Sequence, residues 1–207
     1  EVETKNFRLV SSLSGEIGDW GWESGVTFSR SRSEQEAIAG VYNRYQFHGA
    51  ITGELCSDGT LASFDGTDLN CASGELLPFY NPFLQGDAAN DAVLATAQAR
   101  PTRSGESTVY GWDANFNGEL FTFNDLPAYA SFGVEARREE LNDIPSLNSQ
   151  AQAGNDYLVD VFGFGSSLSE ADRTQYAAFA ELSISLSEQV ELQAAGRYDH
   201  YDDFGGT

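Results

Sequence analysis

Residues 175–199 read QYAAFAELSISLSEQVELQAAGRYD, and the alternation in this stretch decides the fold. Every second side chain from Tyr176 to Leu186 is apolar, and most of the residues between them are polar or small. The alternation resumes at Val190 after a short polar break at residues 187–189. Successive side chains of a β-strand point to opposite faces of a sheet. The stretch therefore predicts a β-hairpin with one apolar face and one polar face.

Two earlier parts of the chain repeat this design. In each of them, two alternating runs flank a short segment that contains glycine, aspartate or asparagine. These residues favour hairpin turns because they tolerate positive φ angles. One hairpin is expected at residues 7–17 and 20–28 around Gly18 and Asp19, and the other at residues 110–120 and 128–136 around residues 124–127.

The spacing of these runs predicts how the strands are connected. About six strands form three hairpins, and runs of roughly 10 to 12 residues suit a tilted strand that crosses a bilayer. The turns within hairpins are short, whereas residues 31–106 and 140–173 are expected to form long connections. Short turns at one rim and long loops at the other are typical of outer-membrane barrels. We therefore expect an all-β fold, an antiparallel up-and-down transmembrane β-barrel segment with long extracellular loops.

The alternation also predicts which side chains face lipid and which face a wet interior. Lipid-facing positions are expected to include Leu182, Leu192 and Val134. The lumen is expected to contain Glu181, Gln193, Arg197, Glu135 and Arg137. Aromatic residues such as Trp20 and Tyr198 lie near the ends of the runs, as expected for rings at the boundary between lipid and water.

The composition excludes some classes of function. The chain has 32 Asp+Glu against 11 Lys+Arg, which gives a net charge of −21. Such a surface repels phosphate, so we expect no nucleic-acid partner. Hydrophobic residues make up 41% of the chain, which is too many for an acidic disordered tail. No apolar run is long enough for a transmembrane helix, an absence that barrel strands do not contradict.

The first long connection contains both cysteines of the chain. Cys56 and Cys71 lie in a polar stretch that is rich in Gly, Asp and Ser. An even number of cysteines at short spacing predicts a disulfide and an oxidising compartment such as the periplasm or cell surface. Two free thiols are the alternative, although they fit a polar, exposed setting less well.

The same connection contains two candidate helices. Residues 87–99 are rich in alanine and predict a short helix that ends before Pro101. Residues 33–50 are either partly helical or, at residues 42–47, extend a strand, and the sequence does not choose between these alternatives.

The sequence contains no recognisable catalytic or metal-binding set. His48 and His200 stand without a Cys/His group at metal-ligand spacing. No nucleophile elbow or phosphate-binding loop is present. Asp58, Asp65 and Asp68 do not match a calcium-loop pattern and are expected to be solvated loop carboxylates. We therefore expect neither enzyme activity nor a cofactor, and ligand-binding residues remain unassigned.

The last part of the chain resembles a known family. Residues 177–182 (AAFAEL) lead into residues 191–207, which read ELQAAGRYDHYDDFGGT. This pattern resembles a barrel hairpin of TonB-dependent receptors, and the loop from Cys56 to Cys71, with residues 77–83 after it, resembles an extracellular loop of that family. The resemblance is specific over residues 177–207 and diffuse elsewhere.

The resemblance implies an architecture and a function. It implies a barrel of about 22 strands that is occluded by an N-terminal plug. Residues 1–207 are expected to be a fragment of that single barrel domain, because neither end resembles a natural terminus and neither plug nor energy-coupling box is present. The implied function is active import of a siderophore, vitamin, sugar or similar scarce nutrient across the outer membrane of a Gram-negative bacterium. Its implied partners are outer-membrane lipid, a nutrient ligand such as a metal chelate, and the TonB complex through the missing N-terminal region.

A soluble protein is the alternative. A secreted β-sandwich for adhesion or carbohydrate binding explains the alternation, the cysteines and the acidic charge. It explains less well the long runs and the regular succession of short and long connections, because strands of soluble proteins are usually shorter.

Overall fold

The computed structural model describes residues 1–84, 86–151 and 160–206. They divide into two compact units. The loop unit comprises Glu1–Glu3, Ser33–Ser104 and Asp143–Ser169, and the sheet unit comprises Thr4–Arg32, Gly105–Asn142 and Glu170–Thr207. Part of the second predicted connection, residues 152–159, and the last motif residue, Thr207, lie outside the described residues.

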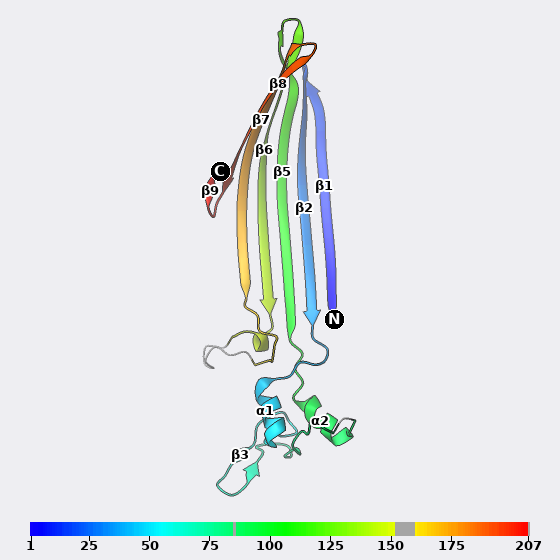
Figure 1. Cartoon of the computed structure of the whole chain (residues 1–207), viewed down its shortest axis with the longest axis vertical. Helices are drawn as coiled ribbons and strands as arrows, with labels where there is room; N and C mark the ends of the chain where they lie inside the picture. Colours follow the sequence, from blue (N-terminus) through cyan, green and yellow to red (C-terminus); the bar gives the residue numbers. More distant parts are fainter. Residues whose placement is uncertain (85, 152–159, 207) are drawn as a thin grey trace. The chain divides into compact units, whose positions relative to one another are not determined.

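An antiparallel up-and-down sheet confirms the predicted fold class (Figure 1). Among the described residues, it has seven strands in the order β1-β2-β5-β6-β7-β8-β9, and it is open, with β1 and β9 at its edges. The strands are β1 (Val2–Ile17), β2 (Trp20–Glu36), β5 (Thr102–Phe123), β6 (Leu126–Pro145), β7 (Ser169–Ser187), β8 (Val190–Tyr201) and β9 (Gly205–Gly206).

Most strands are longer than the alternating runs that predicted them. β1, β2, β5, β6 and β7 have 16, 17, 22, 20 and 19 residues. The predicted connections at residues 31–106 and 140–173 were therefore too long, because β2 continues to Glu36 and β5 already begins at Thr102. Beyond the alternating runs, charged side chains occupy both faces of the strands, so hydrophobic periodicity no longer marks them.

Two-residue turns form the predicted hairpins. Gly18 has a φ of 64° between β1 and β2, where glycine adopts the left-handed conformation without steric cost. Asn124 and Asp125 have φ angles of 51° and 61° between β5 and β6, as a type I′ turn requires. The turn is thus shorter than residues 124–127, because Leu126 already belongs to β6. We call this end of the sheet the turn end, and the opposite end the loop end.

The register of β7 and β8 sorts their side chains into two faces. Leu182 pairs with Ala194 and Ser183 pairs with Gln193, so apolar residues face apolar ones and polar residues face polar ones. The register shifts between Ser185 and Ser187, next to the turn. We call the side of Leu182 the apolar face and the side of Ser183 the polar face.

The loop unit has its own small core. Helices α1 (Arg44–Thr52) and α2 (Ala88–Thr96) bury Ala50, Leu55, Val93 and Ala97 together. Asp87 caps α2 by accepting a hydrogen bond from the Asn90 backbone N–H at 2.9 Å. The predicted helix at residues 87–99 is thus confirmed. At residues 42–47 the strand alternative was wrong, because Asn43 caps α1 instead.

Asn90 fastens a loop onto α2 within this unit. Its buried amide accepts a hydrogen bond from the Asn81 backbone N–H at 2.7 Å and donates to the carbonyls of Asn81 and Leu84 at 3.0 and 2.9 Å. A side chain that satisfies both a donor and two acceptors fixes the loop at residues 81–84. Two short strands, β3 (Ser63–Phe64) and β4 (Leu69–Asn70), form a separate hairpin.

Candidate functional site

The apolar face of the sheet unit is exposed. Leu13 and Ile17 of β1 are 71% and 68% exposed, and Leu192 of β8 is 53% exposed. The side chains that the described part of this unit does bury are small, namely Thr108, Ala128 and Ala177. A single sheet in water needs a second layer over its apolar face. This face is therefore suited to a non-aqueous surrounding.

A row of aromatic rings crosses the apolar face toward the loop end. The centroid of Phe28 in β2 lies 6.0 Å from that of Phe7 in β1 and 5.3 Å from that of Tyr110 in β5. Tyr198 of β8 belongs to the same face, opposite Ala178 of β7. Aromatic rings gather in this way where a barrel wall passes from hydrocarbon to headgroups.

A second aromatic cluster lies toward the turn end. Trp20 of β2 reaches over β5 and contacts Phe132 of β6, with ring centroids 5.6 Å apart. Gly118 makes this possible, because a Cβ atom there would lie 2.8 Å from the indole. Phe116 stacks on Phe132 at 5.3 Å.

Ion pairs mark where the apolar band ends. Two residues beyond Phe28, Arg30 contacts Glu106 at 2.7 Å on the same face. This hydrogen bond lowers the pKa of Glu106. Arg138 of β6 likewise contacts Glu140 at 2.9 Å and Asp172 at 3.5 Å.

The width of the apolar band matches a bilayer. Between the turns and these ion pairs, it covers residues 20–28 of β2, 110–120 of β5 and 176–186 of β7. These spans of roughly 9 to 11 residues are the length that a tilted strand needs to cross hydrocarbon. The strands thus extend past the band at the loop end.

One chain of hydrogen bonds pairs polar groups inside the apolar band. The Trp112 indole N–H donates to the Ser24 hydroxyl at 3.0 Å, and that hydroxyl donates to the Asp113 carbonyl at 3.0 Å. In hydrocarbon an unpaired donor costs several kcal/mol because no water replaces the partner. The sequence analysis did not predict this chain of hydrogen bonds, although the position of Ser24 among apolar residues could have indicated it.

The polar face carries an ion network across three strands. Arg197 of β8 contacts Glu135 of β6 at 2.7 Å and Asp199 of β8 at 2.9 Å. Gln175 of β7 donates to Asp199 at 2.9 Å. The arginine and both carboxylates therefore lie on one face, as the alternation predicts for Arg197 and Glu135.

Phe179 is an aromatic residue on the polar face. It pairs in register with Arg197, and its ring lies over Gly133 of β6, where a Cβ atom would approach the ring Cζ to 2.5 Å. Phe179 interrupts the polar positions of residues 175–185, and its contact depends on a glycine in another strand.

Two recesses open on the polar face. A recess of about 820 Å³ near the turn end is bordered by carboxylates, including Glu16, Glu119 and Glu181. A second recess of about 490 Å³ lies between Arg8 of β1 and Phe179 of β7, with Glu135 and Arg137 of β6 beside it. The predicted lumen residues Glu181, Glu135 and Arg137 thus line recesses of one face, and Gln193 and Arg197 share that face.

The predicted lipid-facing residues lie on the opposite side. Leu182 pairs with Ala194 and Leu192 with Ile184 on the apolar face. Val134 follows Gly133 and precedes Glu135 in β6, which both belong to the polar face, so Val134 belongs to the apolar one. That the two faces meet lipid and water, respectively, remains a prediction.

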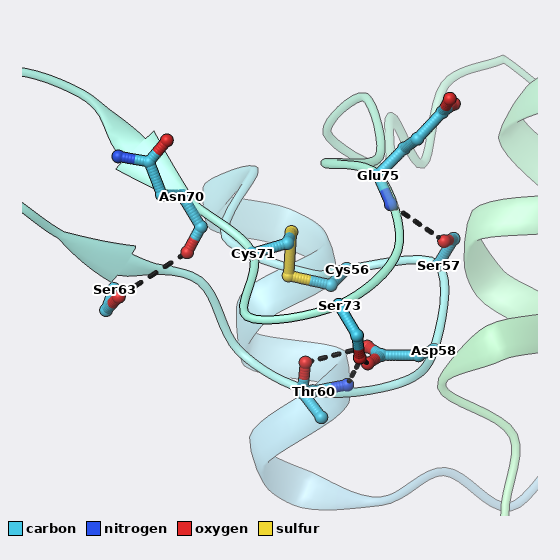
Figure 2. The surroundings of a disulfide bond; sticks show 9 residues. All are labelled: Cys56, Ser57, Asp58, Thr60, Ser63, Asn70, Cys71, Ser73 and Glu75. Carbon is cyan, nitrogen blue, oxygen red and sulfur yellow. Dashed lines mark hydrogen bonds between the residues drawn. A yellow bond between two sulfur atoms is a disulfide. The ribbon is translucent and has the colours of Figure 1, made fainter.

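In the loop unit, Cys56 and Cys71 are joined by a disulfide that closes the chain around β3 and β4 (Figure 2). Beside it, Asp58 accepts hydrogen bonds from the Ser73 hydroxyl, the Thr60 hydroxyl at 2.7 Å and the Thr60 backbone N–H at 3.0 Å. These donors, that of Ser73 foremost, lower the pKa of Asp58 to about 2. Asp58 therefore organises the turn, in addition to being a solvated carboxylate.

No cluster of three or more His, Cys, Asp or Glu residues that could hold a metal ion occurs in residues 1–84, 86–151 and 160–206. Asp65 is used locally, because the backbone N–H groups of Asp68 and Thr67 each donate to it at 2.9 Å and lower its pKa. In the same ranges, no helix is long and apolar enough to cross a bilayer.

Comparison with known protein families gives a match over almost the whole chain. No curated protein matches the chain. Residues 3–207 match the family described as TonB dependent receptor-like, beta-barrel. The match covers both the hairpin at the end of the chain and the strands that precede it. The chain therefore belongs to the TonB-dependent receptor β-barrel family, a family of outer-membrane receptors for nutrient transport.

Proposed function

We propose that residues 1–207 form part of the β-barrel domain of one active-transport receptor in the outer membrane of a Gram-negative bacterium. The receptor imports a siderophore, vitamin, sugar or similar scarce nutrient with energy delivered through TonB. The plug and the coupling box that the family resemblance implies lie outside residues 1–207. In this proposal the chain is not an enzyme, and its partners are outer-membrane lipid, the nutrient and TonB.

One observation carries this proposal. The apolar face is a band of roughly 9 to 11 residues, bordered by aromatic rings and then by ion pairs such as Arg30–Glu106. A bilayer supplies hydrocarbon of that width, interfaces that suit aromatic rings and water where the ion pairs begin. In this arrangement the polar face borders the lumen, and the long connections form the external vestibule.

The soluble β-sandwich accounts less well for the same face. A sandwich buries its apolar side chains between two sheets. Here Phe7, Leu13 and Tyr198 are each more than half exposed, and the small core of the described residues belongs to the loop unit instead. A soluble protein with so large an uncovered apolar face would be prone to aggregate.

Cell fractionation and uptake test the proposal together. The complete protein should be found in the outer-membrane fraction, and cells that lack it should lose uptake of one nutrient from a panel of iron(III) chelates, cobalamin and oligosaccharides. That uptake should stop when a protonophore collapses the inner-membrane potential, because the energy comes from there. A protein that is recovered in the periplasm or medium, or uptake that persists without energy, would contradict the proposal.

A further inference from the structure

The recess of about 490 Å³ on the polar face has the size of a small-molecule site. It lies between Arg8 of β1 and Phe179 of β7. Thr27 and Ser29 of β2 and Gly111 of β5 line it between these two side chains. Their neighbours Phe28 and Tyr110 belong to the aromatic row on the other face, so the recess lies at the level where the wall leaves the apolar band.

Part of the charge around this recess is already paired. Glu135 is held by Arg197 at 2.7 Å, and Arg137 is held by Glu139 at 2.8 Å. These four residues therefore offer a ligand little net charge. The acidic recess near the turn end differs, because the charged residues that line it, Glu16, Asp19, Glu119 and Glu181, are all acidic.

The remaining polar groups of the recess are free to bind a ligand. The guanidinium of Arg8, the carboxylate of Asp113 and the amide of Asn115 have no hydrogen-bond or ion-pair partner among the side chains and backbone groups that the structure describes, and neither do the hydroxyls of Thr27 and Ser29. Together they provide one positive charge, one negative charge and several donors and acceptors. A ligand of either sign would be attracted by one charged group and repelled by the other.

Phe179 lines one side of the recess, and Gly111 leaves its middle open. Phe179 is half-buried over Gly133 and provides an apolar surface on one side. Gly111 has no side chain in the middle, and a Cβ atom added there would meet Thr27 at an ordinary 3.6 Å. A side chain at position 111 would therefore narrow the recess, and its Cβ atom would not clash.

We infer that this recess binds an uncharged, hydroxyl-rich ligand of the saccharide class. Sugar hydroxyls donate and accept hydrogen bonds at once, which suits Arg8, Asp113 and Asn115 together. The apolar face of a sugar ring packs on an aromatic ring such as Phe179. The inference rests on the proposed function and adds the substrate class to it.

Calorimetry on the complete purified receptor tests the inference. The probes are maltotriose, cellotriose, xylotriose and mannotriose, with iron(III) citrate as an anionic chelate and iron(III) ferrioxamine B as a cationic one. We expect at least one trisaccharide to bind and both chelates to bind more weakly or not at all. Arg8→Gln and Asp113→Asn should each weaken trisaccharide binding about tenfold or more, because each removes a charged hydrogen-bonding group.

Gly111→Val and Gly105→Val form the matched pair. Both glycines lie in β5, and an added Cβ meets no atom within 4 Å at Gly105 and only Thr27 at Gly111. Gly111→Val should abolish trisaccharide binding by narrowing the middle of the recess, and Gly105→Val should leave it unchanged. Equal outer-membrane amounts of the two variants exclude a folding defect.

Three outcomes would overturn the inference: no trisaccharide binds, a charged chelate binds more tightly than every trisaccharide, or binding survives Gly111→Val. The cell uptake assay separates this failure from that of the proposed function. Energised uptake of a chelate or of cobalamin without trisaccharide binding refutes the saccharide site alone. Absence of energised uptake of any nutrient refutes the transport proposal.

Discussion

Arg197 of β8 contacts Glu135 of β6 across the intervening strand β7, and its guanidinium Nη2 lies 2.7 Å from the carboxylate Oε2. The same guanidinium contacts Asp199, two residues further along β8. In the stretch Gly-Arg-Tyr-Asp, alternation therefore places arginine and aspartate on the polar face and Tyr198 on the apolar one. Both partners of the long-range pair are about 40% exposed. Such a pair adds at most about 1 kcal/mol of stability.

The assignment of faces predicts opposite tolerance at adjacent residues. Leu182 lies near the middle of the apolar band in β7, and Ser183 lies on the polar face. Leu182→Arg should lower the free energy of unfolding by about 2–4 kcal/mol, because a charge near the bilayer midplane is poorly solvated. Ser183→Arg should cost far less. Urea unfolding of the complete barrel in lipid vesicles measures both, and equal costs would refute the assignment.

A close contact on the polar face predicts a second matched pair. A Cβ atom at Gly133 would lie 2.7 Å from the Ala114 carbonyl and 2.5 Å from Phe179, whereas at Gly196 it would meet nothing within 4 Å. Gly133→Ala should destabilise the barrel by about 1–3 kcal/mol through overpacking. Gly196→Ala should be close to neutral in the same unfolding experiment. If both substitutions are neutral, Phe179 does not lie over Gly133.

The sequence predicted the hairpins because each depends on local features. The apolar alternation at residues 175–199 and the positive φ angles of Asn124 and Asp125 are properties of short segments. The lengths of the strands could not be predicted in the same way. Beyond Phe28 and Ala136, the pairs Arg30–Glu106 and Arg138–Glu140 continue the sheet with charged residues, which hydropathy does not distinguish from a loop.

Oxidation state provides a prediction for the loop unit. Cys56 and Cys71 should form a disulfide in the mature protein, and mass spectrometry of a non-reduced digest should find their peptides linked. The bridge closes a loop with a sequence separation of 15, so its loss should destabilise the loop unit by about 3 kcal/mol. Replacing both cysteines with serine should accelerate proteolysis within residues 53–84 more than cleavage of the sheet. Rapid alkylation of both thiols in the native, unreduced protein would contradict the prediction.

The pKa of Asp58 predicts how the same loop responds to acid. Hydrogen bonds from Ser73 and Thr60 lower this pKa from its ordinary 3.8 to about 2. A carboxylate with a depressed pKa contributes its full stabilisation above pH 3.8, and the contribution disappears as the pH falls through about 2. NMR titration of the Asp58 carboxyl should therefore show a midpoint near 2, and Ser73→Ala should raise it. An ordinary midpoint in both proteins would mean that these hydrogen bonds do not form.

The candidate site was predicted in part. Alternation was sufficient to place Arg197, Glu135 and Leu182 on their faces. It did not predict the recess between Arg8 and Phe179, because the recess depends on the order of five neighbouring strands. The contact of Trp20 with Phe132 was also beyond the sequence, since it requires Gly118 in the strand between them.

Spin-label accessibility along residues 176–186 tests the central claim most directly. Each position of β7 in the complete receptor is labelled in turn in lipid vesicles, and collisions with oxygen and with a water-soluble nickel chelate are measured. Even-numbered positions such as 182 should be accessible to oxygen, which concentrates in hydrocarbon, and odd-numbered positions such as 183 should not show this preference. A two-residue period in oxygen accessibility with its maxima at the even positions would establish that the apolar face meets lipid. Even-numbered positions that are shielded from both reagents would mean that this face is packed inside a protein core, and the account would be wrong.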